Sequence, residues 1–126
     1  MKLMTFETEP GIGARTGYVD GSEVVDLTAT WPDMASLIAA APRMEDLRAA
    51  GRGRHSLDTV RFLPPTQGSG RTFCVGLNYQ AHVAESGRAT PEHPSVFVRL
   101  DSAQVGHGEP VIRPAISEMF DFEGEL

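Results

Sequence analysis

Short apolar runs, separated by glycine and proline, follow one another along the whole chain. Weak alternation near the start and two runs on either side of the Asp20-Gly21 pair predict a small antiparallel sheet with a hairpin. Asp33 stands at an N-cap position ahead of a helical stripe of apolar residues, namely Met34, Leu37, Ile38 and Ala41. Pro42 separates this helix from a second predicted helix, and a short strand follows.

The pattern changes after the glycine-containing segment 66–70. Apolar runs of the kind found in buried strands, TFCVGLNY and SVFVRL, flank a short helical segment, QAHVAESG. The chain closes on another alternating run, FDFEGEL. We therefore expect an α+β fold, with a small accessory α+β domain over residues 1–65 and the beginning of a β-rich domain over residues 66–126.

Composition and charge narrow the classes of partner. The 126 residues carry a formal net charge of −6 at pH 7, so we expect no nucleic-acid or anionic membrane surface. No apolar run approaches the roughly 20 residues that cross a bilayer, and the N-terminus lacks the pattern of a signal peptide. The single cysteine, Cys74, forms no internal disulfide and is expected in the core, which favours the reducing cytoplasm.

The terminal run carries three carboxylates on alternate residues. Asp121, Glu123 and Glu125 share one face of a strand, because successive side chains of a strand point to opposite sides. Carboxylates gathered in this way suit a hard divalent cation such as Mg²⁺, which would also offset their mutual repulsion. A solvent-facing edge strand is the alternative, and the alternation by itself favours that alternative.

A second candidate is the pair His82 and Glu85 within QAHVAESG. Three residues apart on a helix, the two side chains meet on one face, and a carboxylate that holds one imidazole nitrogen raises the basicity of the other. Such a pair suits a general base for water, whereas the alternative is a surface contact of little energetic value. Arg99, at the end of an apolar strand, suits either a substrate carboxylate or a salt bridge. Ordinary solvated loops or turns are expected for the other histidines, His55, His93 and His107.

Taken in order, the motifs of the second half resemble one family. FCVGLNYQAHVAESG, PSVFVRLDSAQVGHGEPVIRP and SEMFDFEGEL are similar to the fumarylacetoacetate hydrolase family from about Arg71 to Leu126. The resemblance implies that the second domain is a mixed β-sandwich or roll of the type found in that family. It also implies a third metal ligand, an aspartate, beyond Leu126. We therefore expect the sequence to be the truncated N-terminal part of a longer bacterial protein.

The resemblance carries functional residues onto matching positions of this sequence. The glutamates of the E-x-E motif, Glu123 and Glu125, are implied as ligands of Mg²⁺, or of Mn²⁺ or Ca²⁺ in its place. His82 and Glu85 are implied as the pair that activates water. Asp121 fits the family pattern without being one of its usual ligands.

The implied enzyme acts on a small 2-oxo acid. Tyr79 and Arg99 are implied as substrate contacts, with Arg99 standing where the family commonly has a lysine. The expected reaction is divalent-metal-dependent hydrolysis of a C–C bond in an acylpyruvate or 1,3-dioxo acid, of the fumarylacetoacetate or fumarylpyruvate type. An isomerase or decarboxylase of 2-oxo acids in aromatic catabolism is the alternative. Resemblance also implies a homodimer. A non-catalytic fragment is the rival interpretation, and no turnover is expected from the 126 residues alone.

Overall fold

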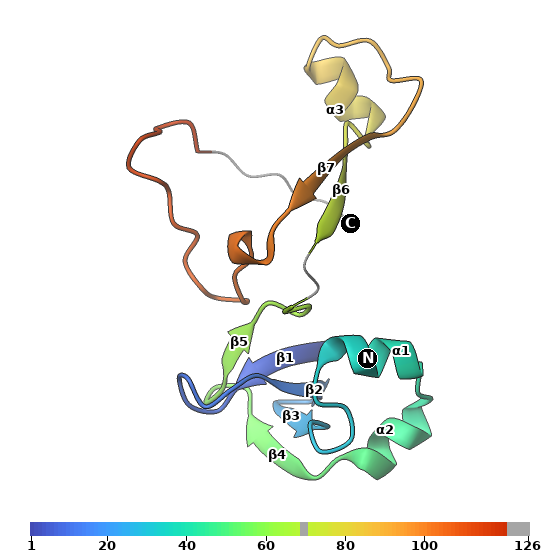
Figure 1. The fold of residues 1–126 in the computed structure, drawn as a ribbon, viewed down its shortest axis with the longest axis vertical. Coiled ribbons are helices and arrows are strands. Elements are labelled where there is room, and N and C mark those ends of the chain that lie inside the picture. The colour runs from blue at the N-terminus through green and yellow to red at the C-terminus, as the bar shows by residue number, and fades with distance from the viewer. Residues whose placement is uncertain (69–70, 121–126) are drawn as a thin grey trace.

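Two antiparallel sheets organise the chain, whose computed structural model describes residues 1–68 and 71–120 (Figure 1). A five-stranded sheet has the order β4-β3-β2-β1-β5, and a two-stranded sheet pairs β6 with β7. The strands are β1 (Leu3–Glu7), β2 (Arg15–Asp20), β3 (Glu23–Asp26), β4 (Gly53–Ser56), β5 (Arg61–Leu63), β6 (Thr72–Gly76) and β7 (Ser95–Arg99). The helices are α1 (Met34–Ala40), α2 (Met44–Ala50), α3 (Gln80–Glu85) and the short 3₁₀ helix η1 (Asp101–Ala103). This combination confirms the predicted α+β class.

The β2–β3 hairpin forms at the predicted turn. Asp20 pairs with Glu23, and Gly21 at the tip has a φ of +63°, which glycine adopts without strain. The sheet continues through β4, which the sequence pattern did not predict because its residues, GRHS, show no apolar alternation. This polar strand forms because every one of its residues pairs with a residue of β3.

Helix α1 begins at the predicted cap, Asp33, whose carboxylate accepts a backbone hydrogen bond of 2.7 Å in the first turn. Met34 and Leu37 are buried as predicted, but Ile38 is 58% exposed. The predicted stripe is wrong for Ile38, which is exposed although it lies within α1, and for Ala41, which has a left-handed backbone and caps the end of the helix. In the described part of the chain, no helix has the length and apolar character needed to cross a membrane.

Both faces of the five-stranded sheet are covered. One core cluster joins the strands to α1 and α2, and its buried members are Tyr18, Val25, Leu27, Met34, Leu37, Leu47 and Ala50. A smaller cluster on the other face consists of Met4, Phe6 and Val24, with partly buried neighbours such as Phe62. Alternate residues of the same strands supply the two clusters, as the two-residue period of a strand requires.

A buried carboxylate, Asp26, connects β2, β3 and β4. It accepts hydrogen bonds from Nε of Arg15 at 2.6 Å and from the backbone nitrogen of Thr28 at 2.8 Å. Burial acts to raise the pKa of this carboxyl, but the hydrogen bonds from Thr28 and Arg15 outweigh burial and hold the pKa below its usual value. The predicted solvated loop for His55 is wrong, because His55 lies on β4 with Nε2 3.7 Å from the Asp26 carboxylate and its ring 5.8 Å from that of Phe6.

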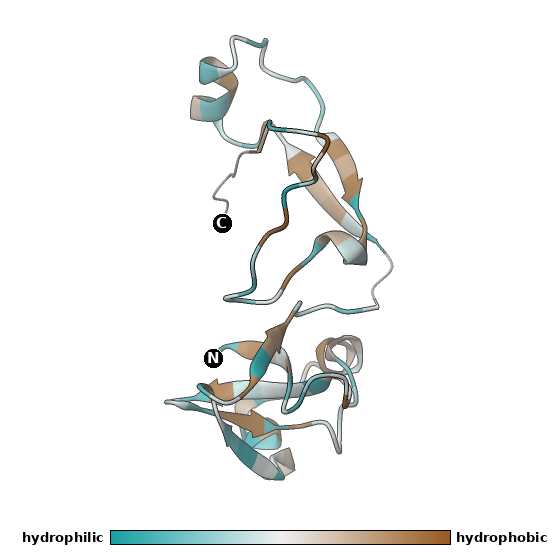
Figure 2. Cartoon of the chain, turned by 90° about the vertical axis from the view of Figure 1, so that its left-hand side faces the viewer, coloured by the Kyte–Doolittle hydropathy of each residue, from teal (hydrophilic) through white to brown (hydrophobic). Residues whose placement is uncertain are grey.

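The two-stranded sheet is exposed, which corrects the expectation of buried strands. Phe73 is 66% exposed and Val98 49% exposed, and Cys74 is half-buried rather than in a core. Figure 2 shows hydrophobic colour along both strands of this sheet. Within residues 1–68 and 71–120 the sheet has only two strands, so it lacks the second layer that would bury an apolar face. The division into domains 1–65 and 66–126 stays a prediction.

We expect Asp26→Asn to destabilise the protein by about 1–3 kcal/mol at neutral pH, because Arg15 loses its charged, buried partner. The lowered pKa of Asp26 means that its stabilisation is present above the unfolded-state pKa, near 3.8, and is lost as the pH falls through the folded-state pKa. Asp26→Asn should therefore also flatten the decline of stability in acid. Urea unfolding between neutral pH and pH about 3 measures both effects.

The matched control is Asp58→Asn, the same chemical change at an exposed residue of the loop between β4 and β5. It should leave the unfolding free energy within about 0.5 kcal/mol of the unaltered chain. Equal curves for the two variants at every pH would contradict the role given to Asp26.

Candidate functional site

Helix α3 carries the two residues predicted to form a general base. Tyr79 precedes the helix in an extended conformation, and its carbonyl accepts a hydrogen bond from the backbone nitrogen of Val83 at 3.1 Å. Val83 is buried, whereas His82 and Glu85 are exposed. Because one helical turn separates His82 from Glu85, their side chains share a face of α3. The fold thus brings Tyr79, His82 and Glu85 to the same end of the two-stranded sheet (Figure 1).

A hollow of about 300 Å³ lies beside this helix. It is lined by the end of β6, by Gln80 and Val83 of α3, and by the segment 90–95, which includes His93. His93 is exposed, as predicted. His82 and Glu85 are not lining residues, since they occupy a different face of α3 from Gln80 and Val83. The hollow and the predicted pair therefore lie on different sides of one helix.

Arg99 lies at the opposite end of the two-stranded sheet from α3. It pairs with Thr72, whereas Gly76, which leads into the helix, pairs with Ser95. The two pairs are four residue steps apart along each strand, a distance of about 13 Å. The described residues therefore do not bring Arg99 next to His82, and the role of Arg99 as a substrate contact stays a prediction.

The predicted metal ligands lie outside the described residues. Glu123, Glu125 and the neighbouring Asp121 all belong to the segment 121–126. In residues 1–68 and 71–120, no three His, Cys, Asp or Glu side chains gather closely enough to hold a metal ion. The role of Glu123 and Glu125 as ligands of Mg²⁺ therefore stays a prediction.

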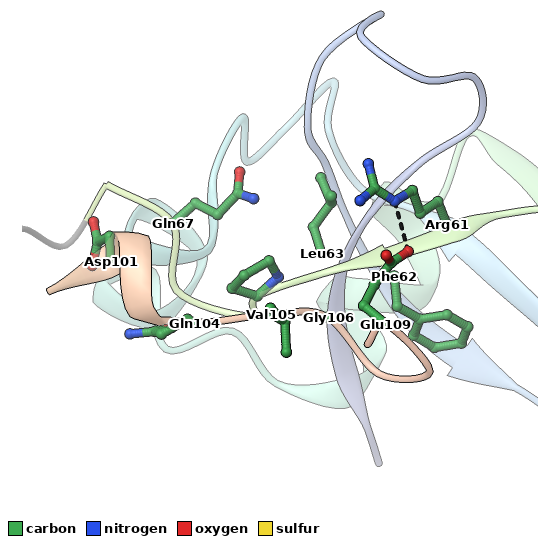
Figure 3. Close-up of a pocket in the computed structure, with 10 residues that line it drawn as sticks. Arg61, Phe62, Leu63, Gln67, Asp101, Gln104, Val105, Gly106 and Glu109 are labelled. Carbon is green, nitrogen blue, oxygen red and sulfur yellow. Dashed lines mark hydrogen bonds and ion pairs between the residues drawn. The ribbon is translucent and has the colours of Figure 1, made fainter. Parts of the chain in front are cut away.

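A second hollow, of about 330 Å³, lies between β5 and the segment 101–109 (Figure 3). An ion pair closes one end, with Nε of Arg61 2.7 Å from Oε1 of Glu109, and Asp101 lies at the other end. Nη1 of Arg61 also lies 3.0 Å from Oε1 of the buried Glu7. The hydrogen bond from Arg61 holds the pKa of the Glu109 carboxyl below its usual value, and the bonds to Glu109 and Glu7 raise the pKa of Arg61.

Gly106 packs its backbone directly against β5. A Cβ at this position would lie 1.9 Å from the carbonyl oxygen of Phe62, so no other residue fits without a shift of the backbone. The next residue, His107, lies in a turn as predicted, with its ring 5.3 Å from that of Phe62 in an edge-on arrangement. Sequence reasoning missed this docking and the Arg61–Glu109 pair, because the partners lie far apart along the chain and no spacing in the sequence relates the 104–109 segment to β5.

The comparisons with known proteins concern mainly the second half of the chain. Residues 71–126 match the family model described as Fumarylacetoacetate (FAA) hydrolase C-terminal. The mitochondrial oxaloacetate tautomerase fahd2 of Xenopus laevis is 26% identical over 137 aligned positions, and the mitochondrial oxaloacetate tautomerase Fahd2a of Rattus norvegicus is 29% identical over 138. Both alignments cover 100% of this chain. An uncharacterized protein of Archaeoglobus fulgidus is 43% identical over 70 residues, which is 56% of this chain.

The chain is much shorter than these relatives. It covers 43% of the Xenopus protein, 44% of the rat protein and 28% of the Archaeoglobus protein. It therefore spans less than half the length of each of the three.

We expect Gly106→Ala to destabilise the protein by about 1–3 kcal/mol, because the added methyl group would overlap the Phe62 carbonyl. Gly106 does not have a positive φ, so the clash alone decides the result. Gly53→Ala is the matched control, since a Cβ there meets nothing closer than 3.6 Å. Urea unfolding measures both variants. An equal loss in the two would contradict the close packing of Gly106 on β5.

Proposed function

We propose that the protein interconverts the keto and enol forms of an oxaloacetate-type 2-oxo acid, because residues 71–126 match the fumarylacetoacetate hydrolase family model and the chain is similar to a protein named oxaloacetate tautomerase. The observation that carries the proposal is the pair His82 and Glu85, one turn apart on α3. Alignment of the whole chain with two proteins named oxaloacetate tautomerase supports it.

In this proposal His82 moves the proton. Its imidazole, oriented by the carboxylate of Glu85, takes a proton from the carbon next to the keto group. The electron pair of the broken C–H bond forms the C=C bond, and the keto oxygen receives a proton to give the enol. Imidazole suits both directions of this exchange, because it gains and loses protons near neutral pH.

Two further residues are proposed to bind the substrate. Tyr79 stands directly before α3, so its phenol is close in sequence and in space to the helix that carries His82. Arg99 is the proposed partner of a substrate carboxylate, because a guanidinium binds a carboxylate through two parallel hydrogen bonds. Arg99 lies at the end of the two-stranded sheet away from α3. It can bind the substrate carboxylate only if the substrate reaches from α3 toward that end.

A divalent cation is part of the proposal, with Glu123 and Glu125 as two of its ligands. The chemistry of this donor set fits Mg²⁺, which takes carboxylate oxygens and water, and Mn²⁺ or Ca²⁺ would accept the same donors. A bound cation would polarise the keto oxygen and the adjacent carboxylate of a 2-oxo acid. The protein residues would then need only to hold the substrate and to transfer the proton.

Hydrolysis of an acylpyruvate or 1,3-dioxo acid is the second candidate, favoured by the match to a hydrolase family model. His82 would here take a proton from water, and the oxygen of that water would attack the carbonyl distant from the carboxylate. The C–C bond beside this carbonyl would break, and its electron pair would pass to the pyruvate-type fragment as an enolate. His82 would return its proton to this fragment, so that the products are a carboxylic acid and a pyruvate-type acid. Decarboxylation of a 2-oxo acid uses the same enol-forming chemistry and is a third outcome of the assay below.

Assembly and compartment are also proposals. We propose a homodimer, as the resemblance to the family implies, and the cytoplasm, because a single half-buried cysteine suits a reducing compartment. The relatives with mitochondrial names make the mitochondrion the alternative compartment. Localisation of the tagged natural gene product would decide between the two.

The test uses the natural gene product that carries this chain, with oxaloacetate and an acylpyruvate as substrates in the presence of Mg²⁺. His82→Gln and Glu85→Gln should each lower kcat, by about 10²-fold or more for His82, because the proton acceptor or its orienting group is lost. Loss of the enol absorbance with conserved mass indicates tautomerisation, whereas release of two acids indicates hydrolysis and release of CO₂ indicates decarboxylation.

Glu45→Gln is the matched control, since it makes the same change as Glu85→Gln at an exposed residue of α2. Glu45 pairs only with Arg43 at the surface among the described residues, so kcat and KM should not change. Full activity of both His82→Gln and Glu85→Gln on every substrate would overturn the assignment of this pair.

A further inference from the structure

A hollow of about 240 Å³ in the five-stranded sheet has no part in the proposed reaction. It is lined by Arg15, Asp26, Ala29, Arg52, Gly53 and His55. Two arginines and a histidine thus surround a single carboxylate. We propose that this hollow binds a small oxyanion, namely a carboxylate or phosphate group, between the guanidinium groups of Arg15 and Arg52.

Asp26 holds Arg15 in position without using all of its donors. One carboxylate oxygen of Asp26 lies 2.6 Å from Nε of Arg15 and 2.5 Å from Nη2. The other oxygen accepts the backbone hydrogen bond of Thr28 at 2.8 Å. A guanidinium has five N–H donors, and in the described part of the chain Nη1 of Arg15 has no acceptor. Because the Arg15 side chain is 36% exposed, a bound anion can reach these donors.

Arg52 supplies a second positive charge, which no carboxylate of the described residues neutralises. Its backbone nitrogen donates to the carbonyl of Asp26 at 3.0 Å, which holds the residue beside the hollow. Its Nη1 donates to the carbonyl of Ala49 at 3.1 Å, and no carboxylate pairs with it among residues 1–68 and 71–120. By contrast, Arg54, two residues later on β4, lies 2.6 Å from a carboxylate oxygen of Asp20 and 2.7 Å from one of Glu23.

The local charge therefore differs from that of the whole chain. The chain carries a net charge of −6, but the residues that line this hollow include two arginines and one aspartate. Arginine is the residue best suited to carboxylate and phosphate, because its planar donors match two oxygens at once. The excess of positive charge inside a partly enclosed space accordingly favours an anion.

The shape of the hollow limits the size of its ligand. Ala29 has a small side chain and Gly53 has none, so neither residue fills the hollow. A Cβ at Gly53 would lie 3.6 Å from Nε2 of His55, so a longer side chain at this position would occupy the space. His55 adds an imidazole that is 33% exposed. A volume of about 240 Å³ is smaller than the usual site for a drug-sized molecule, so it suits phosphate or a short carboxylic acid rather than a nucleotide.

The test titrates the chain with inorganic phosphate and, separately, with malonate, at constant pH and ionic strength, while the ring resonances of His55 are followed by NMR. We expect a saturable change at His55 with at least one of the two anions. Phosphate alone, malonate alone or both identify the oxyanion that the hollow accepts. Arg52→Gln should weaken this binding about tenfold, the size expected for a lost hydrogen bond to a charged group.

Arg48→Gln is the matched control, because it removes the same charge from an exposed position on α2 that does not line the hollow. It should leave the dissociation constant within about twofold of that of the unaltered chain. Gly53→Val fills the hollow without changing any charge and should also weaken binding, which keeps the inference testable if Arg52→Gln fails to fold. Non-saturating changes, or equal weakening by Arg48→Gln and Arg52→Gln, would overturn the site.

Discussion

Arg61 is the residue on which the relation between the two halves of the structure depends. Its guanidinium lies 3.0 Å from a carboxylate oxygen of Glu7 on β1 and 2.7 Å from one of Glu109 in the second half. The Glu7 side chain is only 8% exposed, so its charge would be costly to bury without a partner. The pairing of Glu7 with Arg61 in the β1–β5 register supplies that partner, and the same guanidinium then holds Glu109. Strand pairing and loop docking are therefore linked through one side chain.

The docking of the 104–109 segment on β5 also supports the two-stranded sheet, because a sheet of two strands is only marginally stable alone. From Gly106, packed on β5, the chain runs back to Gln104, whose amide donates to the hydroxyl of Thr72 at 2.9 Å. A continuous series of contacts thus leads from the five-stranded sheet through the 104–109 segment to the start of β6. The end of the two-stranded sheet that carries Arg99 is the end tied in this way, while α3 lies at the other end. The first 65 residues consequently do more than precede the family motifs, because they position the segment that follows β7.

Local features of the sequence predicted the local features of the fold. Asp20-Gly21 and Asp33 each act within a few residues, so their turn and cap could be predicted without knowledge of the rest of the chain. The wrong or missing predictions concern features that depend on parts of the chain distant in sequence. Ile38 lies on the predicted stripe of α1 but is exposed, and the apolar residues of β6 and β7 have no covering layer among the described residues. Strand β4 was missed because pairing with β3, and not apolar alternation, makes it a strand.

The same distinction between local and long-range features applies to the proposed catalytic pair on α3 and to the proposed anion-binding hollow around Asp26. One turn of helix separates His82 from Glu85, so the motif could predict their common face, and their catalytic role stays a prediction. The antiparallel register that sets Arg99 apart from them has no counterpart in the motif. The hollow around Asp26 takes its residues from three strands and the segments between them, and no spacing along the chain brings them together. The net charge did not predict this hollow either, because it sums the charges of the whole chain. Anion binding depends on the charges within about a Debye length, roughly 8–10 Å at physiological salt. An acidic chain can hold a cationic hollow wherever its carboxylates pair with other arginines, as Asp20 and Glu23 pair with Arg54 and not with Arg52.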